Sequence, residues 1–394
     1  MSNLIVKGGN KLSGELTPAG NKNSALPILC ATLLTNEPIV LHNFPELTDV
    51  KQLIELMDSL GSKIEWDKEK QSVRIDNSKF CDSFGQQGFP LGMRGAVLLL
   101  SPLLHRHRVL EVKEKIGGCS LGIRELDPHL EVLEHLGAKI SSNSLLRIEA
   151  KEGLKGASLW QDYMSVTTTE NFTMAASLAK GKSVMVNAAS EPHVQDLCNF
   201  LIKMGANIDG VGSSTLVVQG VESLHGTEFT ISSDHHEITT LLALGAMTGG
   251  EVRVKNAIPQ YFDLINKTFT KFGVNIKYDG DTAYSVSNKP LKVLKPFTQN
   301  LLQKVEAAPW PYFPADLLPL MMALAVKAEG NSMFWNKLYE GGFFWIPEMI
   351  KFGAHIVMCD PHRVIVFGGK ELKPATVCSP NIIRATVALM MIAL

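Results

Sequence analysis

The stretch KFGVNIKY, from Lys271 to Tyr278, is one of five copies of a short phrase that recurs along the chain. Each copy reads as an apolar residue, a glycine, two variable residues and an aliphatic residue. The glycines are Gly61, Gly137, Gly205, Gly273 and Gly353, so the copies lie about 70 residues apart. A glycine at this place typically ends a helix, and the aliphatic residue then opens a strand. The recurrence therefore predicts a chain of similar structural units.

The sequence around each phrase repeats as well. In the first unit, a helix is expected over residues 24–34, followed by the short β-branched stretch at 38–41. Apolar residues at helical spacing between Val50 and Leu60 predict a second helix, and turn residues at 68–71 predict a closing hairpin. The order β-α-β-α-β-β indicates an α/β fold.

The number of units sets the expected domain organisation. A chain of 394 residues is longer than one ordinary core supports, so we expect two domains of three units. Residues 22–230 would form the first domain, and residues 1–21 with 231–394 the second. A sixth unit starts at about Ser379 with an apolar helix over residues 381–394. We therefore expect five complete units and a truncated sixth, either because the chain is a fragment or because its last strand and helix were lost.

Composition and charge exclude several classes of partner. The formal net charge is −1, so no overall positive field would hold nucleic acid or a membrane surface. No apolar run reaches the roughly 18 to 20 residues of a membrane span, and the first residues lack the apolar core of a signal peptide. Six scattered cysteines without a CxxC pair favour reduced thiols and a cytoplasmic protein. We expect a monomer or a weak homo-oligomer.

A metal centre is not expected. The residues His235, His236 and Glu237 are adjacent, but they have no partner set at metal-ligand spacing. Adjacent histidines are also expected to point to different sides. We therefore predict that these side chains hold no metal.

Four stretches carry a resemblance to a known family. They are AGNKNSALPILCATLL from Ala19, GGCSLGIRELDPHLEVLEHLGAKI from Gly117, SVTTTENFTMAASLAKG from Ser165 and PADLLPLMMALAVKAEG from Pro314. With the repeat, they resemble the enolpyruvyl transferases over essentially the whole chain, most closely the branch that uses UDP-N-acetylglucosamine. The resemblance implies a two-domain inverse α/β barrel, an active site in the cleft between the domains and a catalytic loop at about residues 115–125 that acts as a lid.

The reaction that the resemblance implies transfers the enolpyruvyl group of phosphoenolpyruvate to a hydroxyl of UDP-N-acetylglucosamine and releases phosphate. This is the first committed step of peptidoglycan precursor synthesis. By resemblance, Cys119 protonates the vinyl carbon or forms an adduct, and the antibiotic fosfomycin would alkylate it. Lys22 would contact phosphoenolpyruvate, and Asp316 would be the base for the acceptor hydroxyl. The structural alternatives are an incidental loop cysteine, a solvated lysine and a helix-capping aspartate.

Further residues match substrate contacts of the family. A substrate with about three negative charges needs several converging cations, and arginine suits bidentate recognition of carboxylate and phosphate. The resemblance implies substrate contacts at Asn23, Arg94, Arg124, Asp127, Ser165, Val166, Leu338 and Arg384. It implies no cofactor and no metal, and the partners are small molecules.

The sequence also departs from the family's pattern. The departures are Tyr163 in place of a nucleotide-contacting lysine, Glu125 and Pro128 in the catalytic loop region, Asp234-His235-His236-Glu237 in place of an Asp-Arg-Ile-Glu motif, and Gly341-Gly342 in place of an Asn-Arg pair. The family's final arginine would lie beyond residue 394. Two alternatives therefore stay open. The chain could act on another nucleotide such as UMP, or it could be a non-catalytic paralogue that binds a nucleotide sugar.

Overall fold

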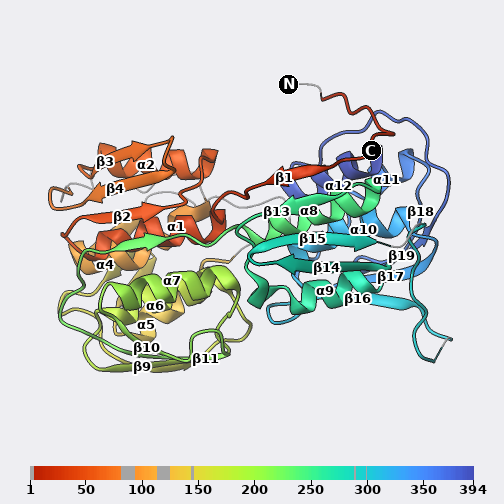
Figure 1. The fold of residues 1–394 in the computed structure, drawn as a ribbon. Helices are drawn as coiled ribbons and strands as arrows, with labels where there is room; N and C mark the ends of the chain where they lie inside the picture. The colour runs from red at the N-terminus through yellow and green to blue at the C-terminus, as the bar shows by residue number, and fades with distance from the viewer. Residues whose placement is uncertain (1–3, 81–93, 113–124, 143–145, 288–289, 299) are drawn as a thin grey trace. The chain divides into compact units, whose positions relative to one another are not determined.

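The computed structural model describes residues 4–80, 94–112, 125–142, 146–287, 290–298 and 300–394 (Figure 1). The described chain divides into two compact units. The 19–232 unit takes the described residues from Ala19 to Ser232, and the 233–394 unit takes those up to Pro18 and from Ser233 onward. Each unit has its own hydrophobic core, because the buried apolar side chains fall into two separate clusters.

The 19–232 unit contains three sheets among its described residues. In spatial order they consist of β12 (Glu228–Thr230), β2 (Ile39–His42), β4 (Ser72–Asp76) and β3 (Lys63–Asp67); of β5 (Val109–Val112), β7 (Leu146–Glu149) and β6 (Lys139–Ser142); and of β10 (Asn207–Asp209), β11 (Thr215–Gln219), β9 (Lys182–Val186) and β8 (Ser158–Trp160). Its helices are α1 (Lys22–Ala31), α2 (Thr48–Ser59), α4 (Leu100–His107), α5 (Asp127–His135), α6 (Val166–Ser177) and α7 (Pro192–Lys203), with the 3-10 helices η1 (Thr32–Leu34) and η2 (Arg94–Leu99).

The 233–394 unit is built from the same parts. Its described sheets, in spatial order, are β1 (Gly14–Leu16), β13 (Val252–Val254), β15 (Thr282–Ser287) and β14 (Val274–Asp279), and β16 (Gln303–Ala307), β17 (Gly330–Asn336), β19 (Arg363–Gly368) and β18 (His355–Asp360). Its helices are α8 (His235–Thr248), α9 (Asp263–Thr270), α10 (Leu318–Lys327), α11 (Ile346–Lys351) and α12 (Ile383–Ala393), with the 3-10 helices η3 (Pro259–Tyr261) and η4 (Ala315–Leu317).

The predicted order of elements is seen directly in the third repeat. It runs β8, α6, β9, α7, β10 and β11, and β8 lies parallel beside β9 with Ser158 opposite Val184. The fifth repeat has the same order, from β16 to β19. In the first and fourth repeats the first strands are exchanged: β1 pairs with β13, and β12 pairs with β2. The chain therefore passes from one unit to the other after β1 and again after β12.

The repeat glycines have the backbone conformation that their place in the sequence predicts. Their φ angles lie between 76° and 105°, in the left-handed region that glycine enters without cost. Gly273, for example, follows the end of α9 at Thr270, and β14 begins at the next residue, Val274. The phrase is thus a helix stop joined to a strand start, as the sequence indicated. The predicted hairpin at residues 68–71 is also present.

Buried helices form the inside of each unit. In α10, every residue from Leu318 to Val326 is buried, and in α6 every residue from Thr168 to Ser177 is buried. A helix without an exposed face must be covered on all sides, which places it between other elements. The sheets then lie outside, as expected for an inverse α/β barrel. None of the helices that the structure describes is both long and apolar enough to cross a membrane.

One acidic side chain lies within the core of the 19–232 unit. Glu170 on α6 is 1% exposed, and its Oε1 atom has no hydrogen-bond partner among the described residues. Burial, and secondarily the charge of Glu191, raises the pKa of Glu170 well above its ordinary value of 4.5. The folded protein therefore holds a proton on this carboxyl at a pH where the unfolded chain has released it.

This proton makes stability depend on pH. Because the pKa of Glu170 is raised in the folded state, proton binding by this carboxyl adds to the free energy of unfolding. This contribution is fully present below pH 4.5 and is lost as the pH rises from that value through the folded pKa. We expect Glu170→Gln to raise the melting temperature at pH 8, by about 2–4 °C for each kcal/mol recovered. Calorimetric scans between pH 5 and 9 would show a flatter profile for this variant. Glu55→Gln, at an exposed site on α2, is the matched control. Parallel profiles for Glu170→Gln and wild type would contradict the assignment.

Candidate active site

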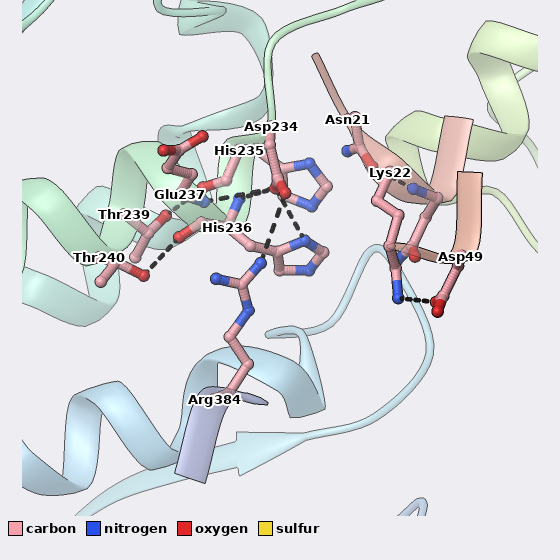
Figure 2. A network of polar contacts seen from close by, with 11 residues as sticks. Asn21, Lys22, Asp49, Asp234, His235, His236, Glu237, Thr239, Thr240 and Arg384 are labelled. Atoms are coloured by element: carbon pink, nitrogen blue, oxygen red, sulfur yellow. Dashed lines mark hydrogen bonds and ion pairs between the residues drawn. The ribbon is translucent and has the colours of Figure 1, made fainter. Parts of the chain in front are cut away.

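Lys22 is the first residue of helix α1, two residues before the expected start of this helix. Asn21 is the N-cap, and its side-chain oxygen accepts a hydrogen bond of 2.8 Å from the backbone N–H of Asn23. The Lys22 ammonium lies 3.1 Å from a carboxylate oxygen of Asp49, in the first turn of α2 (Figure 2). Both side chains are partly exposed, at 30% and 49%, so the ion pair is weak. An anionic ligand could therefore replace Asp49 as the partner of the Lys22 ammonium with a small loss of interaction energy.

The predicted nucleotide contacts Asp127, Ser165 and Val166 lie at the starts of two packed helices. Asp127 begins α5, and Ser165 caps α6, which begins at Val166. The two helix starts are close together, because the hydroxyl of Thr167 lies 3.3 Å from Nε2 of His129. The Ser165 hydroxyl accepts a hydrogen bond of 2.8 Å from the Thr168 hydroxyl, so it also has a structural role. Pro128 sits in the first turn of α5, where proline is well tolerated.

Three of the predicted residues have side chains outside the described part of the chain. Cys119 and Arg124 lie outside the described residues. Arg94 begins η2, and its side chain also lies outside the described part of the chain. The Cys119 thiol and the guanidinium groups of Arg94 and Arg124 therefore stay predictions.

A pocket in the 233–394 unit brings together two of the predicted residues, Asp316 from η4 and Arg384 from α12. It is also lined by Ala315, Leu318, Pro319, Asn336, Tyr339, Gly342, Phe343, Trp345 and Ile382. Leu338 lies in the turn after β17, next to the lining residues, and is 37% exposed. The pocket thus combines one carboxylate and one guanidinium on largely apolar walls.

Asp316 is not a helix cap. The N-cap positions of η4 and α10 are Pro314 and Leu317, and neither makes a side-chain capping bond. The Asp316 carboxylate has no hydrogen bond or ion pair with any residue that the structure describes. Its oxygens therefore remain available to a ligand in the pocket.

Arg384 is held by Asp234, the N-cap of α8 (Figure 2). A guanidinium nitrogen lies 3.4 Å from Asp234 Oδ2, and Asp234 Oδ1 accepts a 2.8 Å hydrogen bond from the backbone N–H of His236. Burial acts to raise the pKa of Asp234. The hydrogen bond from His236 and the charges of His236, Arg384 and His235 outweigh it and hold that pKa well below its ordinary value. Asp234 is therefore an anion that fixes the arginine.

The expectation that His235 and His236 point to different sides is wrong. Their ring centroids lie 4.0 Å apart, and Nδ1 of His236 lies 3.2 Å from Asp234 Oδ1. The aspartate at the helix start attracts the second ring, which brings the two rings together. Donor atoms of Asp234, His235 and His236 lie within 4.8 Å of one another. Both Asp234 oxygens are engaged, one by Arg384 and the other by His236, so a metal ion bound here would have to displace these partners.

Comparison with known proteins supports the resemblance seen in the sequence. The family model for EPSP synthase (3-phosphoshikimate 1-carboxyvinyltransferase) matches residues 6–394. The UDP-N-acetylglucosamine 1-carboxyvinyltransferase of Borrelia garinii subsp. bavariensis is 41% identical over 394 residues, which covers 100% of this chain and 91% of that protein. The protein of the same name from Bradyrhizobium diazoefficiens is 38% identical over 389 residues, with 99% and 89% covered.

Solved structures show the same fold. The enolpyruvyl transferase NikO from Streptomyces tendae has a TM-score of 0.81 at 20% identity, covering 98% of this chain and 89% of that one. EPSP synthase from Acinetobacter baumannii has a TM-score of 0.69 at 15% identity, with 98% and 91% covered. The expected fold class is thereby confirmed. The chain belongs to the EPSP synthase family of carboxyvinyltransferases.

Proposed function

We propose that this enzyme transfers the enolpyruvyl group of phosphoenolpyruvate to a hydroxyl of UDP-N-acetylglucosamine and releases phosphate. The observation that carries the proposal is the match over the whole chain to relatives named for this reaction, at 34–41% identity. The pocket with Asp316 and Arg384 supports it, because the reaction needs a base for the acceptor and a cation for an anionic substrate.

The chemistry assigns a role to each reacting group. Asp316 would take the proton of the acceptor hydroxyl as the hydroxyl oxygen bonds to C2 of phosphoenolpyruvate. The electron pair of the double bond would take a proton from the Cys119 thiol, which gives a methyl group and a tetrahedral intermediate. Loss of a proton from that methyl group and departure of phosphate from C2 would restore the double bond. Proton transfers of this kind accelerate reactions by about 10²–10⁴ each.

The lysine and arginine side chains would bind the anionic groups of the substrates. Lys22, Arg94, Arg124 and Arg384 would bind the phosphate and carboxylate of phosphoenolpyruvate or the nucleotide phosphates. Arg384 suits the task because Asp234 fixes its orientation, so less side-chain freedom is lost on binding. Asp127, Ser165 and Val166 would contact the nucleotide, and Asn23 and Leu338 the acceptor sugar. The family match supports these roles, together with the positions of those side chains that the structure describes.

The proposal also covers organisation and location. We propose that residues 22–230 form one domain and that residues 1–21 with 231–394 form the other. We place the reaction in the cytoplasm, which the free thiols of Cys30, Cys198, Cys359 and Cys378 support. The partners are the two small-molecule substrates.

The acceptor is the part of the proposal that needs a direct test. Tyr163 is 53% exposed, and Gly342 lines the Asp316 pocket, so two departures from the family pattern lie where a ligand could reach them. Phosphate release from phosphoenolpyruvate should be measured with UDP-N-acetylglucosamine, with UMP and without acceptor. We expect sustained release with UDP-N-acetylglucosamine alone. Release only with UMP would assign the enzyme to another nucleotide, and no release from folded protein would favour a non-catalytic binder.

A further inference from the structure

Asn336, the last residue of β17, is held rigidly at the edge of the Asp316 pocket. Its side-chain oxygen accepts hydrogen bonds from the backbone N–H groups of Leu338 and Tyr339, at 3.0 and 3.2 Å. Its backbone N–H donates to the carbonyl of His362 at 2.9 Å. The residue is only 3% exposed. The turn after β17 therefore fixes both the position and the orientation of the amide.

The orientation leaves one donor group without a partner. Since Oδ1 accepts two backbone hydrogen bonds, Nδ2 must face the other way. Among the described residues, Nδ2 has no hydrogen-bond acceptor. Asn336 lines the same pocket as Asp316 and Arg384. Because this donor lies at the wall of the pocket, a ligand oxygen in the pocket could accept its hydrogen bond.

The space for this amide depends on Gly342. A Cβ atom added at Gly342 would lie 2.2 Å from Nδ2 of Asn336, far inside van der Waals contact. The glycine cannot move away easily, because its carbonyl accepts a 3.0 Å hydrogen bond from the indole N–H of the buried Trp345. Gly342 is one of the two residues at which the sequence departs from the family's Asn-Arg pair. The glycine that replaces a residue of the family's Asn-Arg pair thus leaves the space that the Asn336 amide occupies.

We propose that the Asn336 side-chain nitrogen is a specificity-determining donor that binds an oxygen atom of the acceptor substrate. This inference rests on the proposed function, since it places the acceptor in the pocket where Asp316 receives the acceptor's proton. The donor would distinguish acceptors that carry a hydroxyl, carbonyl or phosphate oxygen at this place from those that do not. A site built to donate a hydrogen bond discriminates strongly, because an unsuitable ligand leaves the donor buried and unpaired.

The test uses the intact protein with two variants, one that changes the Asn336 amide itself and one that changes the residue packed against it. Asn336→Asp keeps the oxygen that holds the turn but replaces the donor with a second acceptor. Gly342→Ala keeps the amide but crowds it. We expect each to raise the KM and the calorimetric Kd for UDP-N-acetylglucosamine at least about tenfold, as loss of a buried hydrogen bond predicts. The KM for phosphoenolpyruvate should stay close to wild type in both variants, whereas the crowding at Gly342 should lower the melting temperature of Gly342→Ala. Asn275→Asp, at an exposed position on β14, is the matched control.

The possible outcomes separate the two claims. If wild type turns over UDP-N-acetylglucosamine and both variants keep its KM and Kd, the donor role of Asn336 is refuted and the proposed function stands. If wild type transfers to no acceptor, the proposed function fails and this assignment fails with it. If Asn336→Asp does not fold, Gly342→Ala decides the question in the same assay.

Discussion

The Asp316→Asn protein is expected to bind both substrates and to turn them over at least about a hundredfold more slowly than wild type. Asparagine keeps the size of the side chain but cannot accept a proton. Asp316 has no hydrogen bond or ion pair with the described part of the chain, so its replacement should leave the fold unchanged. The measurement is kcat under saturating phosphoenolpyruvate and acceptor, with KM for each.

The matched control for this prediction is Asp263→Asn. Asp263 is exposed in the first turn of α9, where its loss costs a few tenths of a kcal/mol in stability at most and should leave kcat unchanged. A kcat of Asp316→Asn within about threefold of wild type would exclude Asp316 as the base. The acceptor's proton would then have to leave through another group.

Arg384→Met is expected to lower kcat/KM for phosphoenolpyruvate by about a hundredfold, which corresponds to about 2.7 kcal/mol. The substitution removes the cation and leaves Asp234 as a nearly buried anion without it, so an anionic substrate would meet a negative charge. Steady-state kinetics with phosphoenolpyruvate varied at fixed acceptor gives this ratio. Arg363→Met is the control, because that arginine forms a surface ion pair with Asp360 on another part of the unit.

Asp234→Asn separates the charge of Arg384 from its position. This variant keeps the guanidinium but weakens its anchor, so we expect a smaller effect, about a tenfold rise in KM for phosphoenolpyruvate with little change in kcat. Equal effects of Arg384→Met and Asp234→Asn would mean that the arginine acts only when Asp234 fixes it. No effect of either would remove Arg384 from the substrate site.

The fold could be predicted from the sequence because its signals are local. The repeat glycine, the apolar spacing of residues 50–60 and the hairpin turn at 68–71 each depend on a few neighbouring residues. Residues 1–21 were assigned to the second domain, but no local signal predicts that β1 pairs with β13 or β12 with β2, because strand partners are chosen by contacts far apart in the chain. Boundaries also shifted slightly: the helix expected at 24–34 is α1 followed by the 3-10 turn η1.

The site was predicted less completely. Asp316 and Arg384 share a pocket, but only the family resemblance suggested it, because their positions depend on how η4 and α12 pack. Asp234 and Arg384 are 150 residues apart, and no local sequence pattern predicts their ion pair. The close approach of the His235 and His236 rings was misjudged because adjacent positions normally diverge, whereas here Asp234 contacts the His236 ring and holds it beside that of His235. Asn336 was missed because a strand-ending asparagine is usually only a turn residue.

The most direct measurement is the mass of the nucleotide product after incubation of the wild-type protein with phosphoenolpyruvate and UDP-N-acetylglucosamine. We predict that the nucleotide sugar gains the mass of one carboxyvinyl group and that one phosphate appears for each molecule converted. An unchanged nucleotide sugar after prolonged incubation with folded protein would contradict the proposed reaction, whatever ligands the protein binds.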